Sequence, residues 1–145
     1  MGMYRRLRAA VIGVVSIALL VSLVGVLPAV ASVPPQPSCK VTASPHTVLP
    51  YGHTTLEVAI KNGPRDVTLS SAITVTWVSR PSATATKVAD LATGPSGTGV
   101  VSVVYPTQFS HGTTQYPGEY QVSVTVTGHS AAVSCSTNFA VMSRR

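Results

Sequence analysis

The sequence predicts an all-β protein that folds as a Greek-key sandwich of about seven short strands. After residue 38, apolar residues recur with a period of two, as they do in strands that bury one face. Segments rich in Val, Ile and Thr are separated by turns that contain Gly, Pro and Asn. No stretch of this region shows the helical period, so we expect no long helix in it.

The predicted strands follow one another at the spacing typical of a sandwich. The first places Cys39 and Val41 on one face, and the second ends at the turn sequence Asn62-Gly63-Pro64. A Gly- and Ser-rich turn at 93–99 separates the fourth from the fifth. In order, the strands are expected within residues 39–43, 54–60, 72–78, 86–92, 99–105, 116–128 and 131–141.

Two of these segments carry further information. Residues 116–128, YPGEYQVSVTVTG, alternate without a miss after Pro117-Gly118, which predicts a strand buried on one face only. Residues 99–105, GVVSVVY, are apolar on both faces. We therefore expect that strand to lie in the centre of its sheet or beneath a covering loop.

The first 31 residues have the pattern of a secretory signal peptide. Arg5, Arg6 and Arg8 precede an apolar stretch from Ala9 to Leu27, and Ala29-Val30-Ala31 is a cleavage signal made of small residues. We expect processing after Ala31, a Pro-rich leader at 32–38, one domain at 39–142 and a basic tail at 143–145. The alternative is that this segment is retained as a membrane anchor, since its length comes close to spanning a bilayer.

The charge of the exported part excludes one class of partner. The formal charge of +6 includes the three N-terminal arginines, so residues 32–145 carry seven basic and four acidic residues, a net +3. Two of those positive charges are Arg144 and Arg145 at the end of the chain. A body with so few cations has no basic stripe for phosphate contacts, and nucleic acid binding is not expected.

Cys39 and Cys135 are the only cysteines, and both lie in the exported part. An even number in an oxidising compartment predicts a disulfide, here between the first and the last strand. Each cysteine shares a strand face with apolar residues, so both sulfurs are expected to point toward the core. Redox catalysis is disfavoured because there is no C-x-x-C motif.

The segment 116–126, followed by Phe139-Ala140-Val141, resembles the last two strands of immunoglobulin-like and PKD-like domains in secreted prokaryotic proteins. The resemblance covers about thirty residues and implies an Ig-like sandwich. It also implies that Tyr120 forms a tyrosine corner, in which the hydroxyl bonds to backbone upstream. Val122 stands where antibody-type domains carry their second cysteine. A shared fold does not imply a function.

Neither catalysis nor a metal site is predicted. The four acids lie on four different elements, so no carboxylate pair is indicated. The histidines lack the short spacings of metal ligands. We expect no cofactor and no resident metal, and a small secreted enzyme or metal carrier is the least favoured class. The four acids are Glu57, Asp66, Asp90 and Glu119, and the four histidines are His46, His53, His111 and His129.

The candidate binding segment is the loop 105–118, with Tyr105, Phe109, His111 and Tyr116. Exposed aromatic rings give a large contact area at a low entropy cost. The competing interpretation, which is the more common case for aromatic residues in such loops, is that these rings cover the end of the core. Thr-rich strands with few charges also leave edges that can pair with another chain.

The expectation is therefore a secreted or envelope-associated, non-catalytic interaction module that meets a protein or carbohydrate partner at the cell surface. The alternative is an accessory or structural subunit of an envelope complex or filament, held by a retained N-terminal segment or by strand donation. Membrane contact is expected only if that segment is retained.

Overall fold

The computed structural model describes residues 35–144, and residues 36–145 form one compact unit. The predicted signal peptide at 1–31 and the first residues of the Pro-rich leader lie outside the described residues, as does Arg145. Within the described part, no helix is long and apolar enough to cross a membrane.

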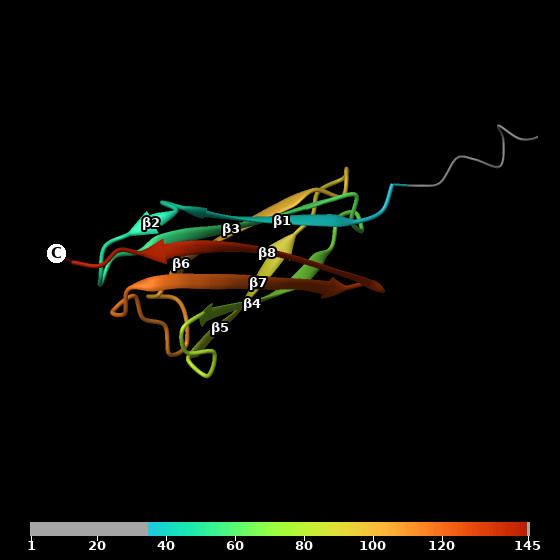
Figure 1. The fold of residues 1–145 in the computed structure, drawn as a ribbon. Coiled ribbons are helices and arrows are strands. Elements are labelled where there is room, and N and C mark those ends of the chain that lie inside the picture. Colours follow the sequence, from blue (N-terminus) through green and yellow to red (C-terminus); the bar gives the residue numbers. More distant parts are fainter. Residues whose placement is uncertain (1–34, 145) are drawn as a thin grey trace, which may run out of the picture. The chain divides into compact units, whose positions relative to one another are not determined.

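The described chain is all-β, as predicted, and its strands form two sheets (Figure 1). Eight strands are present, one more than expected. They are β1 (Ser38–Ser44), β2 (Thr47–Val48), β3 (Thr54–Lys61), β4 (Thr68–Trp77), β5 (Thr84–Ala92), β6 (Gly99–Tyr105), β7 (Gly118–Gly128) and β8 (Ala131–Val141). The additional strand, β2, is only two residues long and pairs in parallel with the end of β8.

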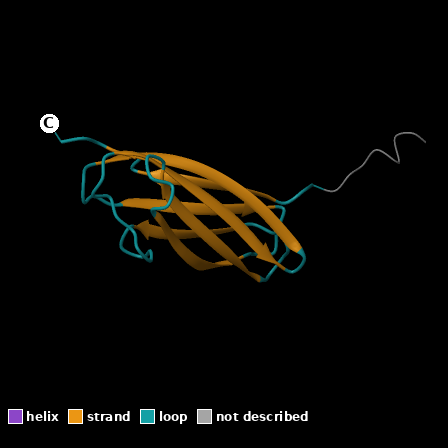
Figure 2. Ribbon diagram, turned by 60° about the horizontal axis from the view of Figure 1, so that its bottom comes forward, coloured by secondary structure: helices purple, strands orange, loops and turns teal. Residues whose placement is uncertain are grey.

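The sheets are a three-stranded one, ordered β1-β3-β6, and a five-stranded one, ordered β2-β8-β7-β4-β5. The two pack face to face as a β-sandwich (Figure 2). β4–β5 and β7–β8 are hairpins, whereas each of the other five connections takes the chain from one sheet to the other. Such crossing connections are those of a Greek key.

Alternation of side chains places the core between the sheets. β7 and β3 bury every second residue, and the buried residues of β7 are Tyr120, Val122, Val124 and Val126. The opposing faces meet at the most buried side chains, which include Leu56, Val58, Ile73, Val75 and Phe139. A period of two in the sequence is therefore sufficient to identify the inward faces.

Of the two alternatives for residues 99–105, a position in the centre of a sheet is wrong, and cover by a loop is found in part. β6 is the edge strand of the three-stranded sheet, and Val100 is exposed. Part of this edge is covered by the following loop. The Val104 N–H donates to Gln108 Oε1 at 2.7 Å, and the Gln108 N–H donates to the Val104 carbonyl at 3.0 Å. Gln108 thus occupies both outward backbone groups of Val104, as an added strand would.

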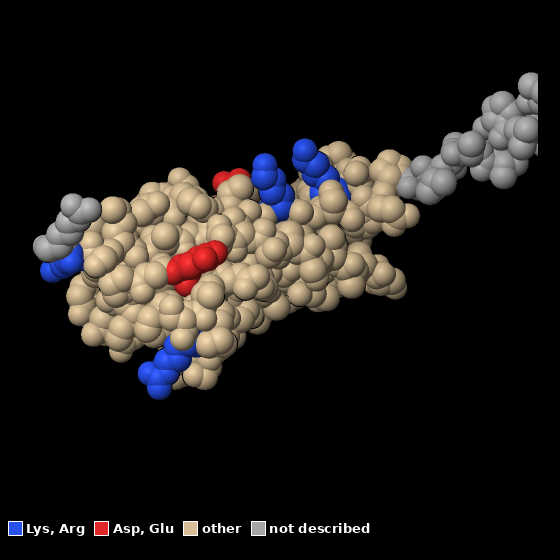
Figure 3. Space-filling view, in the orientation of Figure 1, with Lys and Arg blue, Asp and Glu red and all other residues tan. Residues whose placement is uncertain are grey.

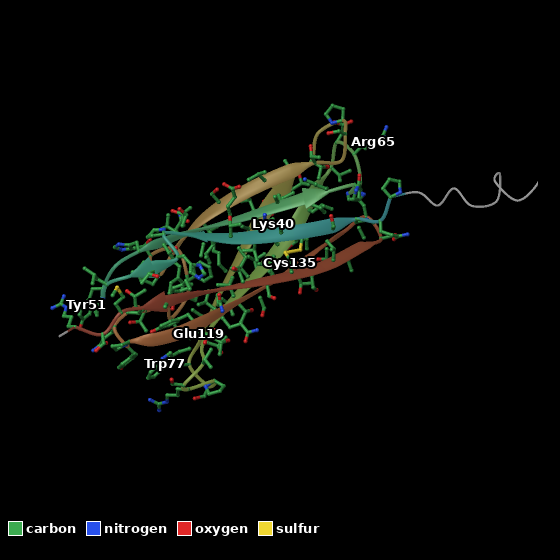
Figure 4. All side chains as sticks on the ribbon, turned by 45° about the horizontal axis from the view of Figure 1, so that its top comes forward. Lys40, Tyr51, Arg65, Trp77, Glu119 and Cys135 are labelled. Atoms are coloured by element: carbon green, nitrogen blue, oxygen red, sulfur yellow. A yellow bond between two sulfur atoms is a disulfide. The ribbon has the colours of Figure 1, made fainter. Side chains whose placement is uncertain are left out.

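A disulfide joins Cys39 of β1 to Cys135 of β8, with 5.7 Å between the Cα atoms (Figure 4). It connects one sheet to the other, because β1 belongs to the three-stranded sheet and β8 to the five-stranded sheet. The predicted pairing is confirmed. An oxidising environment is consistent with such a bond.

The strand directions define two ends of the sandwich. β4, β6 and β8 finish at the same end, where the C-terminus lies (Figure 1). We call this the loop end, and it comprises residues 45–53, 78–83, 106–117 and 142–144. The opposite end carries the turns 62–67, 93–98 and 129–130, and Tyr51 and Arg65 lie at the two different ends (Figure 4).

Candidate binding end of the sandwich

Two of the predicted contact residues belong to the core. Tyr105 and Phe109 are only 2% and 8% exposed, and their rings pack edge to face with centroids 5.1 Å apart. Tyr105 also lies 5.5 Å from the ring of Phe139. Tyr105 and Phe109 therefore close the end of the core, and the expectation that they contact a partner is corrected. Their apolar area is better buried inside than left in water.

The Tyr105 hydroxyl holds the candidate loop in place. It donates to the Thr113 carbonyl at 2.8 Å and accepts from the Thr113 N–H at 3.1 Å. Burial raises the pKa of Tyr105 above its ordinary value, and the hydrogen bond to the backbone of Thr113 opposes that rise. Through these two hydrogen bonds, the buried side chain of Tyr105 holds the loop 106–113 in place.

Tyr120 performs a similar task at the start of β7. Its side chain is 1% exposed, and its hydroxyl donates to the Tyr116 carbonyl at 2.8 Å. This is the upstream backbone contact that a tyrosine corner requires. Burial raises the pKa of Tyr120 to about 12, assisted by the neighbouring Tyr105 hydroxyl.

The other two predicted residues are exposed. His111 lies on the surface in a turn, with a positive φ of 62°. Tyr116 is exposed on one side and stacks with the other on Trp77, at a centroid distance of 4.9 Å and an interplanar angle of 13°. Of the four predicted contact residues, only these two remain available to a partner.

Gly118 makes room for the Tyr116–Trp77 stack. Its φ of 130° lies outside the range that other residues readily adopt, and a Cβ there would lie 3.1 Å from Trp77 Nε1. The indole N–H is buried and has no acceptor among residues 35–144. Trp77 and Tyr116 therefore form a stacked pair in which the ring of Tyr116 is the outer, exposed one.

A second exposed feature, absent from the sequence prediction, is the tight turn Leu49-Pro50-Tyr51-Gly52. The Gly52 N–H donates to the Leu49 carbonyl at 2.8 Å, which closes the turn. The turn is tied to the candidate loop, because the Tyr51 N–H donates to the Thr114 carbonyl and the Thr114 hydroxyl donates to the Gly52 carbonyl. Leu49 and Tyr51 nevertheless point their side chains into solvent, at 63% and 65% exposure.

Tyr51 adopts a left-handed backbone conformation, with φ at 66°. In a turn with Pro at the second position, positive φ at the third is normally supplied by Gly or Asn. For a residue with a Cβ this conformation costs roughly 1–2 kcal/mol. An aromatic side chain that is 65% exposed thus occupies a strained backbone position.

The large exposed apolar side chains are unevenly distributed over residues 35–144. Seven are exposed, and five of them belong to the loop end or border it. Those five are Leu49, Tyr51, Val78, Tyr116 and Met142, and the other two are Val88 and Val100 on strands β5 and β6. Apolar side chains scattered singly need no explanation, but a concentration at one end of a domain indicates a contact surface.

The charges at this end have one sign. Arg80 and Arg144 belong to the loop-end segments, and those segments contain no Asp or Glu. Figure 3 shows acidic side chains over the body of the visible face, set back from the end that bears the C-terminus. The nearest acid along the chain is Glu119, at the start of β7, which accepts a hydrogen bond from Asn138 Nδ2 at 2.8 Å.

A shallow polar hollow of about 360 Å³ lies beside this end, on the outer face of the five-stranded sheet. Its walls combine one apolar side chain with amides, hydroxyls and a carboxylate, from Val78, Glu119, Gln121, Ser136, Thr137 and Asn138. No cluster of three or more His, Cys, Asp or Glu that could hold a metal ion is found within residues 35–144.

The sequence contained a signal for the turn that the prediction missed. Loops are usually polar, yet "VLPYG" places two large apolar residues around a proline in a turn sequence. Val78 and Met142 follow the ends of strands and carry no such signal.

No protein-family model matches this chain, and no curated protein shows significant similarity to it.

Proposed function

We propose that this chain is an exported, non-catalytic, Ig-like interaction module that acts at the cell surface or in the extracellular space and binds its partner through the loop end. The observation that carries the proposal is the concentration of exposed apolar side chains there, five of the seven within residues 35–144. Exposed apolar side chains that gather at one end of a domain often mark an interaction site.

The rigidity of the loop end supports a binding role. Hydrogen bonds tie residues 51 and 52 to Thr114, and the Tyr105 hydroxyl holds Thr113. A surface that is already ordered loses little conformational entropy when it binds. The strain at Tyr51 points the same way, because strained residues persist where they serve a contact.

The Ig-like assignment is supported by strand order. β3 pairs with β6 in one sheet and β4 with β7 in the other, the pairing of strands B with E and C with F in Ig-like domains. The Tyr120 hydrogen bond adds to this support. The disulfide supports export, since such bonds persist in oxidising compartments.

The binding role can be tested by retention of the labelled protein on cells of the source organism. The double variant Tyr51→Gly, Tyr116→Ser removes two exposed rings and should lower retention about tenfold or more. Val88→Ser is the matched control, because Val88 is as exposed as Leu49 but lies on β5. Equal retention of all three proteins would exclude the loop end as the contact surface.

One observation favours the alternative, a subunit of an envelope complex held by strand pairing. β6 is apolar on both faces, yet it lies at an edge, and Gln108 covers only Val104. Such an edge can accept a strand from another chain. Val100→Lys should then release the protein from a membrane or wall complex while leaving loop-end binding unchanged. Retention in the complex would rule this alternative out.

A further inference from the structure

We infer that the partner of the loop end is an anionic lipid surface, into which Leu49, Tyr51 and Met142 insert. These three side chains are defined here as the apolar tip. The inference rests on the proposed function and gives its binding end a specific ligand, in place of the protein or carbohydrate expected from the sequence.

The apolar tip is built for insertion into an apolar layer. Its members are 63%, 65% and 52% exposed, and they come from two segments that the backbone joins, since the Met142 N–H donates to the Val48 carbonyl at 2.8 Å. The polar hollow beside the loop end includes none of them. Polar groups that could orient a sugar therefore lie beside the tip rather than around it.

The chemistry of the tip suits the boundary between headgroups and acyl chains. Tyr is enriched at that depth because its ring is apolar and its hydroxyl remains hydrated. Leu49 and Met142 supply apolar area, and the closed turn keeps Leu49 and Tyr51 on the surface without a further ordering cost. The left-handed φ of Tyr51 has a use here, because it holds an aromatic side chain where a turn would otherwise carry glycine.

Charge selects an anionic surface. Arg144 lies two residues beyond Met142, Arg145 follows it in the sequence, and Arg80 belongs to the same end. No Asp or Glu occurs in the loop-end segments, and the first acid beyond them, Glu119, belongs to β7 and accepts a hydrogen bond from Asn138. Insertion of a few side chains is weak by itself, and stable peripheral binding needs a second, electrostatic contribution.

The test is co-sedimentation with vesicles of phosphatidylcholine alone and of phosphatidylcholine mixed with phosphatidylglycerol. The protein is the form recovered from culture medium. If the cell retains the N-terminal segment, residues 36–145 are used, because they form a compact unit with their own core and disulfide. We expect sedimentation with the anionic vesicles only, and weakening by salt.

Three variants separate the contributions. Leu49→Ser with Tyr51→Gly should reduce partitioning about tenfold or more, and Arg144→Gln should reduce it less and weaken its salt dependence. Val88→Ser, with the same 63% exposure as Leu49, should bind as the unmodified protein does. Urea unfolding of each variant establishes that the domain remains folded.

Two outcomes would overturn the inference: no preference for anionic vesicles, or tip variants that partition like the unmodified protein. The proposed function can survive that failure. If the double variant Tyr51→Gly, Tyr116→Ser lowers retention on cells as expected while no vesicle is bound, the loop end is a binding surface for a protein or carbohydrate.

Discussion

Tyr51 combines two properties that residues of a stable domain seldom combine, a left-handed backbone conformation and a large exposed ring. Neither contributes to the core. The natural explanation at the scale of this residue is that stability has been exchanged for a contact.

Tyr51→Gly should leave the free energy of unfolding unchanged or raise it by up to about 1 kcal/mol. Relief of the left-handed strain is partly offset by the larger backbone entropy of glycine in the unfolded chain. Urea unfolding monitored by fluorescence or circular dichroism measures the change. A clear loss of stability would show that the ring packs against the domain and is not a free contact group.

Tyr120→Phe should lower the free energy of unfolding by about 1 kcal/mol or more, because it removes the buried hydroxyl that donates to the Tyr116 carbonyl. Tyr116→Phe is the control, since it removes the hydroxyl of an exposed tyrosine and leaves in place the backbone carbonyl that accepts from Tyr120. If the two variants unfolded at the same urea concentration, Tyr120 would not hold the start of β7.

The two buried tyrosines also predict how stability depends on pH. The folded-state pKa of Tyr120 is about 12, above the ordinary value of 10.0, and the pKa of Tyr105 is raised as well. The contribution of Tyr120 is therefore fully present below pH 10 and is lost as the pH rises through about 12, and the contribution of Tyr105 changes in the same direction. Urea unfolding between these values should show falling stability, with a shallower fall for Tyr120→Phe. A slope unchanged by that substitution would contradict the assignment.

Among the elements, β7 is the one that the sequence specifies most fully. Its alternation, its entry through Pro117-Gly118 and its aromatic anchor all reappear in the structure. For β6 the sequence left two positions open, because apolar residues on both faces indicate burial but do not say whether a neighbouring strand or a loop provides it. β2 forms only two residue pairs with β8, and so short a segment shows no periodic pattern of apolar residues.

The disulfide acts at the scale of elements, because it joins β1 to β8 across a sequence separation of 96 residues. In the chain-entropy model such a closure stabilises the folded state by about 4–5 kcal/mol. Cys39→Ser with Cys135→Ser should therefore lower the melting temperature without reductant. Under reducing conditions the variant and the unmodified protein should melt together; an equal difference in both conditions would mean that the cysteines matter for packing alone.

For the whole molecule, the proposed export predicts a specific mass. Protein from culture medium should have the mass of residues 32–145 less two hydrogen atoms, and reduction with alkylation should add two alkyl groups. Intact mass spectrometry of fractionated cultures measures this directly. A full-length mass confined to the membrane fraction would replace export with anchoring by residues 1–31.

The candidate site illustrates what a linear pattern leaves open. Tyr105 and Tyr116 look alike in the sequence, since both are aromatic residues at the margins of one loop. In the structure Tyr105 is buried against Phe109 and Phe139, whereas Tyr116 covers Trp77 and faces solvent. The difference depends on which strands end beside each ring, and the sequence of the loop does not show which strands these are.

By itself, the sequence determined the all-β class, the inward faces of the strands and the pairing of Cys39 with Cys135. The period of the side chains is visible within each segment, and two cysteines allow only one pairing. Only the tertiary structure decided that residues 49–51, 78, 116 and 142 gather at one end, and that β6 lies at an edge. These follow from strand order and direction, which bring together segments nearly a hundred residues apart. Since contact surfaces are made of such segments, the proposed binding end could be found only in the folded molecule.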